Sequence, residues 1–317
     1  MGECEGESFA EWAAEWLATS IHLKPKTRLS YEAVLRRYLL PAFADWPIDD
    51  ITQRHVRRAV ASWSQAGIAP GTVSSIYSVL RSVMSSAKAA GLIGLNPCSG
   101  VRMPRAEQRE MLFLDASQVL ALSRAIIDPY PTLILFAAYT GCRAGEIGAL
   151  RMRRLDLDAG KAHIRESLAD VNGQMMFGAT KTYSNRSLAL PTFLVDELRA
   201  YLRDRPSGPD DLVFTSPRLT PIRQNAFLVR YFKPAVRRAG LPAGLRFHDL
   251  RHTCVALLVA QGAHPRAIME RLGHSSIEMT LGRYGHLFPS LDDGLVDGLQ
   301  AAYEAAAQSG DTPPVST

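Results

Sequence analysis

Apolar residues recur at helical spacing along the first ninety residues of the chain. Phe9, Trp12 and Trp16 form an apolar stripe, which we interpret as core packing rather than as a surface on which bases stack. Three further stretches have the same period. The first of their helices is expected to end at Pro41, the second to begin at Thr52, and the third to end at Gly91. The pattern therefore predicts an all-helical domain with helices over 8–19, 27–40, 52–63 and 72–91.

The helical pattern lapses over 96–110, which contains two prolines and three arginines and is predicted to be an inter-domain linker. A second helical region follows, beginning at Asp115 and including the apolar run over 132–141. The residues between 155 and 190 predict three short strands, KAHIRE, GQMMFGAT and RSLALP, with turn-like residues between them. Helices are predicted again over 193–203, 224–239, 246–261, 265–271 and 291–307.

These elements predict a mainly α fold with a small antiparallel β-sheet, divided into two domains. A helical domain would occupy 1–105, and a mixed α/β domain would occupy 111–290. A C-terminal helix and a tail, QSGDTPPVST, would fill 291–317, and the composition of the tail is typical of disorder.

Charge is distributed unevenly along a chain whose net charge is only +5. Residues 20–105 contain 12 Lys and Arg against 4 Asp and Glu. Such a surplus suits a polyanionic partner, because neutralising phosphates releases condensed counterions, although a merely solubilising surface fits the same numbers. The hydrophobic share of 47% and charged share of 21% are typical of a soluble globular protein. Four scattered cysteines and the absence of a signal-peptide pattern favour reduced thiols in the cytoplasm.

Candidate chemistry is concentrated near the C-terminal end. His248, Arg251 and His252 stand at i, i+3 and i+4, so they share one face of a predicted helix, and His274 and Tyr284 follow. Such a trio is also typical of a solvated helix face. Two histidines, an arginine and a tyrosine in this order indicate a site that handles a phosphate and uses a phenol as nucleophile.

Five motifs in order resemble those of the tyrosine recombinase family, also called phage integrases. The resemblance covers nearly the whole chain, and it rests on the motifs TGCRAGEI, ATKTYSNRSLALP, FHDLRHT, LGHSS and RYGHL. It implies a helical core-binding domain followed by a mixed α/β catalytic domain. Phe9 already opens the core-binding helices, so we expect no additional arm-type DNA-binding domain before them.

The resemblance also assigns site residues. Its catalytic positions fall on Arg143, Lys181, His248, Arg251 and His274, and its nucleophile falls on Tyr284. Glu146 matches the acidic residue that supports the first arginine, and Lys161 is the alternative to Lys181, because the hairpin length varies in the family. His252 is expected to give structural support only.

These residue types suit the chemistry of a phosphodiester. Arginines fixed on its oxygens stabilise the charge that grows in the transition state, while His248 would assist deprotonation of Tyr284, His274 would bond the phosphate, and Lys181 would protonate the departing 5′ oxygen. No cluster of metal-binding carboxylates accompanies them, so neither a metal nor another cofactor is expected.

The resemblance implies a specific core site on double-stranded DNA, a homotetramer on that DNA, and an accessory DNA-bending or directionality protein as a further candidate partner. We expect a cytoplasmic enzyme that integrates or excises phage or other mobile DNA. Three alternatives stay open: a recombinase that resolves chromosomes or plasmids, a silent DNA-binding protein, and a type IB topoisomerase.

Overall fold

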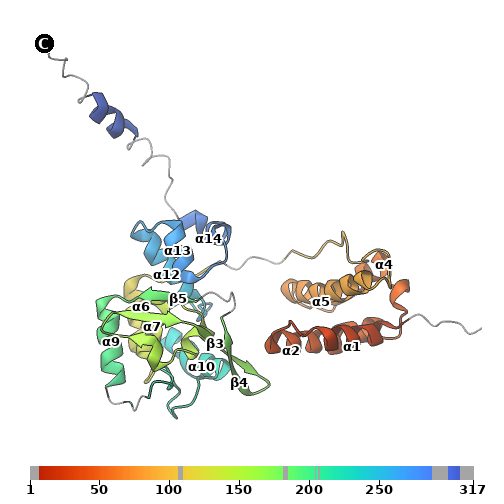
Figure 1. Cartoon of the computed structure of the whole chain (residues 1–317), viewed down its shortest axis with the longest axis horizontal. Helices are drawn as coiled ribbons and strands as arrows, with labels where there is room; N and C mark the ends of the chain where they lie inside the picture. The colour runs from red at the N-terminus through yellow and green to blue at the C-terminus, as the bar shows by residue number, and fades with distance from the viewer. Residues whose placement is uncertain are drawn as a thin grey trace, which may run out of the picture. The chain divides into compact units, whose positions relative to one another are not determined.

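The chain folds into two compact units: Met1–Glu110 together with Asp170–Gln174 form the first, and Met111–Ala169 with Met175–Thr317 form the second. A computed structural model describes residues 7–105, 110–180, 185–203, 205, 208–287 and 299–307. Each unit has its own apolar core. The fold is mainly helical with small antiparallel sheets, as the sequence pattern predicts (Figure 1).

Over residues 7–105 the regular structure is helical, apart from one isolated β-bridge between Ser8 and Pro47. The α1 helix lies against α5, and the indole Nε1 of Trp12 in α1 donates to the carbonyl of Val83 and to Ser86 Oγ in α5. Phe9 is fully buried, and Trp12 and Trp16 are partly buried against the same core, so the aromatic stripe packs inward as predicted. The elements are α1 (Phe9–Thr19), α2 (Pro25–Val34), η1 (Leu35–Leu39), α3 (Leu40–Phe43), η2 (Ile48–Asp50), α4 (Gln53–Gln65) and α5 (Pro70–Ala89).

Pro41 does not end the second helix, contrary to the sequence prediction. A single π turn, η1, precedes it, and the amide of Leu40 donates to the carbonyl of Leu35. Proline lacks an N–H and its ring clashes with the carbonyl four residues earlier, and the wider turn accommodates both effects. The same arrangement recurs in the second unit, where the π turn η4 (Leu228–Phe232) precedes Pro234.

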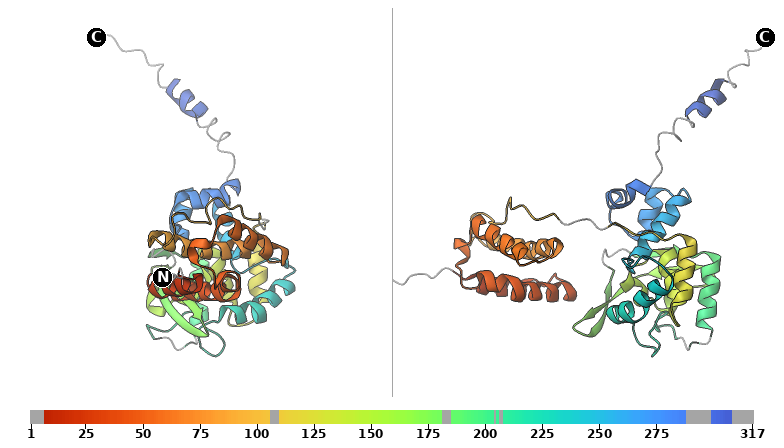
Figure 2. Two further views of the ribbon diagram at one scale, coloured as in Figure 1. Left: turned by 90° about the vertical axis from the view of Figure 1, so that its right-hand side faces the viewer. Right: turned by 180° about the vertical axis from the view of Figure 1, so that it is seen from behind.

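Five short strands lie between residues 155 and 189, against three in the sequence prediction. Strands β1 (Leu155–Asp156), β2 (Lys161–Ile164) and β5 (Arg186–Ala189) form an antiparallel sheet in that order. Strands β3 (Glu166–Val171) and β4 (Gln174–Ala179) form a separate hairpin that projects from the rest of the second unit (Figures 1 and 2).

The helices of the second unit surround a core in which α7 is almost entirely buried. The α12 helix packs on α7, and α13 packs on α14. The motif FHDLRHT, which begins α12, therefore lies against the apolar helix α7. The elements are α6 (Ala116–Ala125), α7 (Pro131–Thr140), α8 (Ala144–Gly148), η3 (Met152–Arg154), α9 (Thr192–Leu202), α10 (Gln224–Phe227), η4, α11 (Lys233–Arg238), α12 (Asp249–Ala260), α13 (Pro265–Leu272), α14 (Ile277–Tyr284) and η5 (Gly285–Leu287).

The predicted C-terminal helix is helical over 299–307, where its residues are exposed. Its earlier part and the predicted disordered tail lie outside the described residues.

Gly141 joins α7 to the first motif, and its replacement is expected to be costly. Its φ is +66°, and a Cβ there would lie 2.7 Å from Leu272 Cδ2 and 3.2 Å from Cys254 Sγ. Strain and overpacking together predict that Gly141→Ala lowers the free energy of unfolding by about 2–4 kcal/mol, measured by urea titration. Gly262→Ala is the matched control, because Gly262 has a φ of +72° and nothing within 4 Å. Equal losses of unfolding free energy in the two variants would show that the close contacts at Gly141 add nothing to the cost of its replacement.

Candidate active site

Glu146 is the centre of a buried cluster of charges. It is 1% exposed and accepts hydrogen bonds from the amide and Nη1 of Arg143, each at 2.9 Å. Arg186 at the start of β5 donates to the same carboxylate through Nη2 at 2.7 Å and Nη1 at 3.2 Å. Burial alone would raise the pKa of Glu146, but the hydrogen bonds and charges of Arg186 and Arg143 outweigh burial and hold it below its usual value. Glu146 is therefore an anion that fixes two arginines.

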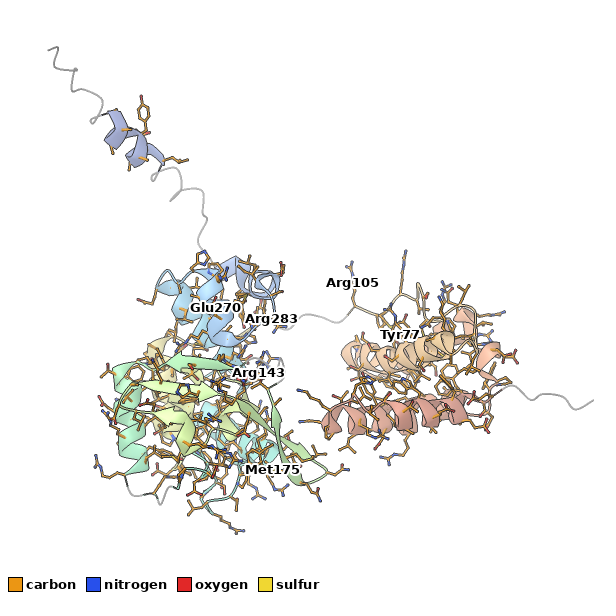
Figure 3. The ribbon with its side chains drawn as sticks, viewed as in Figure 1. Tyr77, Arg105, Arg143, Met175, Glu270 and Arg283 are labelled. Carbon is orange, nitrogen blue, oxygen red and sulfur yellow. The ribbon has the colours of Figure 1, made fainter. Side chains whose placement is uncertain are left out.

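Arg143 is the N-cap residue of α8 and keeps part of its side chain accessible, at 22% exposure. One guanidinium nitrogen is used to bond Glu146. An arginine held at one edge can still present its remaining donors to a bound anion. Figure 3 marks Arg143 on the second unit, as it does Arg283 in α14.

Arg251 is held between the ends of two helices. It is 3% exposed, and it donates through Nη1 to the carbonyl of Gly141 at 2.5 Å and through Nη2 to that of Leu272 at 2.7 Å. These carbonyls close α7 and α13, where the helix dipoles are negative. Burial and the neighbouring charge of Arg143 lower the pKa of Arg251 to about 10, so the guanidinium remains charged at neutral pH.

Two of the predicted histidines lie close to these arginines. His248 is the N-cap residue of α12, and burial followed by the charge of Arg251 lowers its pKa. His274 follows the C-cap of α13, and its Nδ1 lies 2.8 Å from Thr280 Oγ1. Burial and the charge of Arg251 lower the pKa of His274 to about 4. The His274 ring is therefore neutral at pH 7, and it can donate or accept a hydrogen bond without carrying charge.

Tyr284 ends α14 and is fully buried. Its ring lies parallel to that of His274, with centroids 6.4 Å apart and an interplanar angle of 4°. Its hydroxyl lies 2.7 Å from Nδ1 of His252. Burial raises the pKa of Tyr284, while the charges of Arg251 and Arg283 act in the opposite direction. The phenol is thus protonated at neutral pH and lies within range of the arginine cluster.

The structure gathers five of the six predicted site residues into one region of the second unit. Arg143, His248, Arg251, His274 and Tyr284 are linked through the hydrogen bonds and charge interactions described above. Lys181 lies outside the described residues. Lys161, the alternative, is the first residue of β2, and its side chain is exposed.

Two residues of this region have contacts that the sequence pattern does not predict. Arg186 is not among the predicted site residues, although it occupies an inward position of its strand, in register with the buried residues Leu188 and Leu190. An arginine on the apolar face of an alternating strand is the signal that could have indicated a buried ion pair. His252 was expected to be structural only, yet it is the residue that contacts the phenolic hydroxyl of Tyr284.

Within the described part of the chain, no three His, Cys, Asp or Glu side chains gather as they would around a metal ion. Its cysteines, Cys98, Cys142 and Cys254, are buried free thiols. No helix among those residues is long and apolar enough to cross a membrane.

Comparison with known proteins assigns both parts of the chain to one family. The family model "Phage integrase family" matches residues 112–290, and the model "Phage integrase, N-terminal SAM-like domain" matches residues 8–64. The prophage phiRv2 integrase of Mycobacterium tuberculosis is 33% identical over 287 residues, covering 89% of this chain and 75% of that protein. Tyrosine recombinase XerC of Xanthomonas axonopodis is 28% identical over 231 residues, covering 71% of each chain.

Solved structures show the same fold at low sequence identity. The Tn1549 transposon integrase in complex with a circular intermediate DNA has a TM-score of 0.80 and 18% identity, covering 92% of this chain and 99% of that one. A lambda integrase tetramer bound to a Holliday junction has a TM-score of 0.65 and 20% identity, covering 90% of this chain and 78% of that one. Together with the two family models and the phiRv2 relative, these matches show that the chain belongs to the phage integrase family and is a tyrosine site-specific recombinase.

Proposed function

We propose that the gathered residues cleave and rejoin DNA strands, with Tyr284 as the nucleophile. The observation that carries this proposal is the position of the Tyr284 phenol, buried beside two histidines and within range of the charges of Arg251 and Arg143. An oxygen nucleophile next to fixed cations is what attack on a phosphodiester requires.

Arg143 and Arg251 would bind the non-bridging oxygens of the scissile phosphate. Negative charge on these oxygens grows in the transition state, so cations that are already fixed stabilise it more than the ground state. Glu146 fixes Arg143, and the carbonyls at the ends of α7 and α13 fix Arg251. His248 and His274 would complete the set as hydrogen-bonding and proton-handling groups.

Lys181 would protonate the departing 5′ oxygen, as the family resemblance implies. The Tyr284 oxygen bonds to phosphorus as the bond to the 5′ oxygen breaks, which leaves a 3′-phosphotyrosine link and a free 5′ hydroxyl. Because the phosphodiester energy is retained in this link, rejoining to another strand needs neither ATP nor a metal ion.

Double-stranded DNA carrying a specific core site would be the substrate, and residues 1–105 would form the core-type DNA-binding domain. Cations that could meet phosphates are exposed on α4 and α5, namely Arg54, Arg57, Arg58, Arg81 and Lys88. The linker over 96–110 would also follow the DNA backbone. A homotetramer would exchange both pairs of strands, since four cleavages are needed, and an accessory DNA-bending or directionality protein could set the direction.

The similarity to phage and prophage integrases supports integration or excision of mobile DNA in a bacterial cytoplasm. The match to a XerC recombinase keeps a resolving role as the second candidate.

A nicked duplex that carries the DNA junction flanking the gene tests this proposal. In the presence of EDTA, the protein is expected to form a covalent adduct with this duplex. The short fragment between the cleavage site and the nick diffuses away with its 5′ hydroxyl, so rejoining cannot occur and the intermediate accumulates. Peptide mapping should place the nucleotide on Tyr284.

Two results would contradict the proposal. Specific binding without any adduct would favour a silent DNA-binding protein. Relaxation of supercoils by monomers on arbitrary sequence would favour a topoisomerase.

A further inference from the structure

The phenol of Tyr284 has one hydrogen-bonded partner among the described residues, and it is His252. Nδ1 of His252 lies 2.7 Å from the phenolic oxygen, and both side chains are buried. His274 stacks on the tyrosine ring, but its own Nδ1 is directed to Thr280. The His248 ring lies 5.1 Å from that of His252, centroid to centroid. Of the three histidines, His252 is therefore placed to take the phenolic proton.

Asp249 lies beside Nε2 of His252, too far for a hydrogen bond but close enough for its charge to act on that nitrogen. Its carboxylate is 1% exposed and lies 4.0 Å from Nε2 of His252, while Arg246 holds it through its amide at 2.7 Å. A carboxylate facing Nε2 favours hydrogen on that nitrogen, which leaves the lone pair on Nδ1 free to accept from the phenol. Burial, with the neighbouring charge of His248, lowers the pKa of His252 to about 4, so the ring is neutral when it accepts.

We propose that His252, oriented by Asp249, is the residue that accepts the proton of Tyr284 during strand cleavage, a role that the sequence pattern gave to His248. The inference rests on the proposed function. As the Tyr284 oxygen bonds to phosphorus and the bond to the 5′ oxygen breaks, the phenolic proton moves to Nδ1, and the departing oxygen takes its proton from Lys181. The imidazolium that forms faces the Asp249 carboxylate, and rejoining returns both protons.

Binding of DNA would make this transfer easier. Besides His248, the cationic neighbours Arg283 and Arg246 lower the affinity of His252 for a proton. A bound phosphodiester brings negative charge among these groups and so raises the affinity of the imidazole for a proton toward the range suited to a general base. The neutral ring of the free protein is thus compatible with proton transfer in the complex.

Two amide variants separate hydrogen bonding to the phenol from acceptance of its proton. In His252→Asn the amide lies near the position of Nδ1, facing Tyr284, whereas in His252→Gln it lies near that of Nε2, facing Asp249. We expect both variants to lose about 100-fold or more in single-turnover cleavage of the nicked duplex at saturating protein, because an amide can accept the hydrogen bond of the phenol but cannot take its proton. A role in positioning Tyr284 alone predicts instead that His252→Asn, which keeps an acceptor facing the phenol, stays within about 10-fold of wild type.

A second measurement separates deprotonation of the Tyr284 nucleophile from protonation of the 5′ leaving group. A duplex with sulfur in place of the 5′ bridging oxygen has a leaving group that needs no proton. Lys181→Ala should regain its cleavage rate on this substrate, while His252→Gln should not, because its defect is in the nucleophile. A cleavage rate of His252→Asn within about 10-fold of wild type, or rescue of His252→Gln by sulfur, would each overturn the inference.

The controls keep the outcomes distinct. Failure of the wild-type protein to form any adduct contradicts the proposed function itself, whereas an active wild type together with an active His252→Asn contradicts only the role of His252. Binding of the nicked duplex in a gel-shift assay confirms that each variant is folded. If one amide variant is unfolded, the other decides: rescue of its slowed cleavage by the sulfur substrate overturns the inference, as does a cleavage rate within about 10-fold of wild type.

Discussion

Tyr284→Phe is expected to abolish covalent adduct formation completely, while the free energy of unfolding falls by only about 1 kcal/mol. The ring is fully buried and packs among Val255, Ile268 and Leu272, and phenylalanine keeps those contacts. Only the hydroxyl is lost, and with it the nucleophile and the hydrogen bond to His252. Activity and stability should therefore separate widely in this one variant.

Adduct formation on the nicked duplex measures the first effect, and urea unfolding measures the second. Tyr77→Phe is the matched control, since the Tyr77 hydroxyl donates to the carbonyl of Cys98 in the first unit, away from the gathered residues. It should lose a similar stability and keep cleavage. An adduct that persists in Tyr284→Phe would show that another residue attacks.

Most of the fold could be predicted from the sequence, because the period of apolar residues reports which face of a helix is buried. The errors arise where a residue that usually ends a helix or a strand does not end it here. Pro41 is an apparent helix end, but the π turn before it lets the helix continue. The sequence pattern does not predict the β3 strand, because the four residues 170–173 together resemble a turn. In the structure β3 continues to Val171, and the turn is at Asn172 and Gly173, with φ of 51° and 81°.

The candidate site was only partly predictable, for a different reason. The order of five motifs identifies residues that contact the substrate in a whole family. It does not identify partners that only the tertiary fold brings together, such as Arg186, which lies 40 positions from Glu146 in the sequence. His252 stood in a recognised motif but was discounted, because the orientation of Tyr284 toward it cannot be read from spacing.

Arg186→Leu is expected to lower the free energy of unfolding by about 3–5 kcal/mol. Arg186 and Glu146 have side chains that are 6% and 1% exposed, so removing the arginine leaves a buried carboxylate with Arg143 as its remaining cationic partner. The variant also loses the bond from Arg186 Nε to the carbonyl of Arg271. Urea unfolding at pH 7 measures the loss.

Arg266→Leu is the matched control, because Arg266 pairs with Glu270 at the surface, where the side chains are 73% and 61% exposed. Its loss should stay within about 1 kcal/mol. If Arg186→Leu costs no more than this control, the buried pair contributes nothing net to stability. Glu146→Gln combined with Arg186→Leu should cost less than the sum of the single changes, since the two side chains interact directly.

The pH dependence gives the same pair an independent test. The folded pKa of Glu146 is held below its unfolded value, so its contribution is fully present above the unfolded pKa of about 4.3 and is lost as the pH falls through the folded pKa. In Arg186→Leu the main cause of that depression is gone, and burial favours the protonated acid. The difference in stability between wild type and variant should therefore narrow as the pH is lowered from 7 toward about 4. A difference that stays constant with pH would show that packing by Arg186, rather than its charge on Glu146, accounts for the loss.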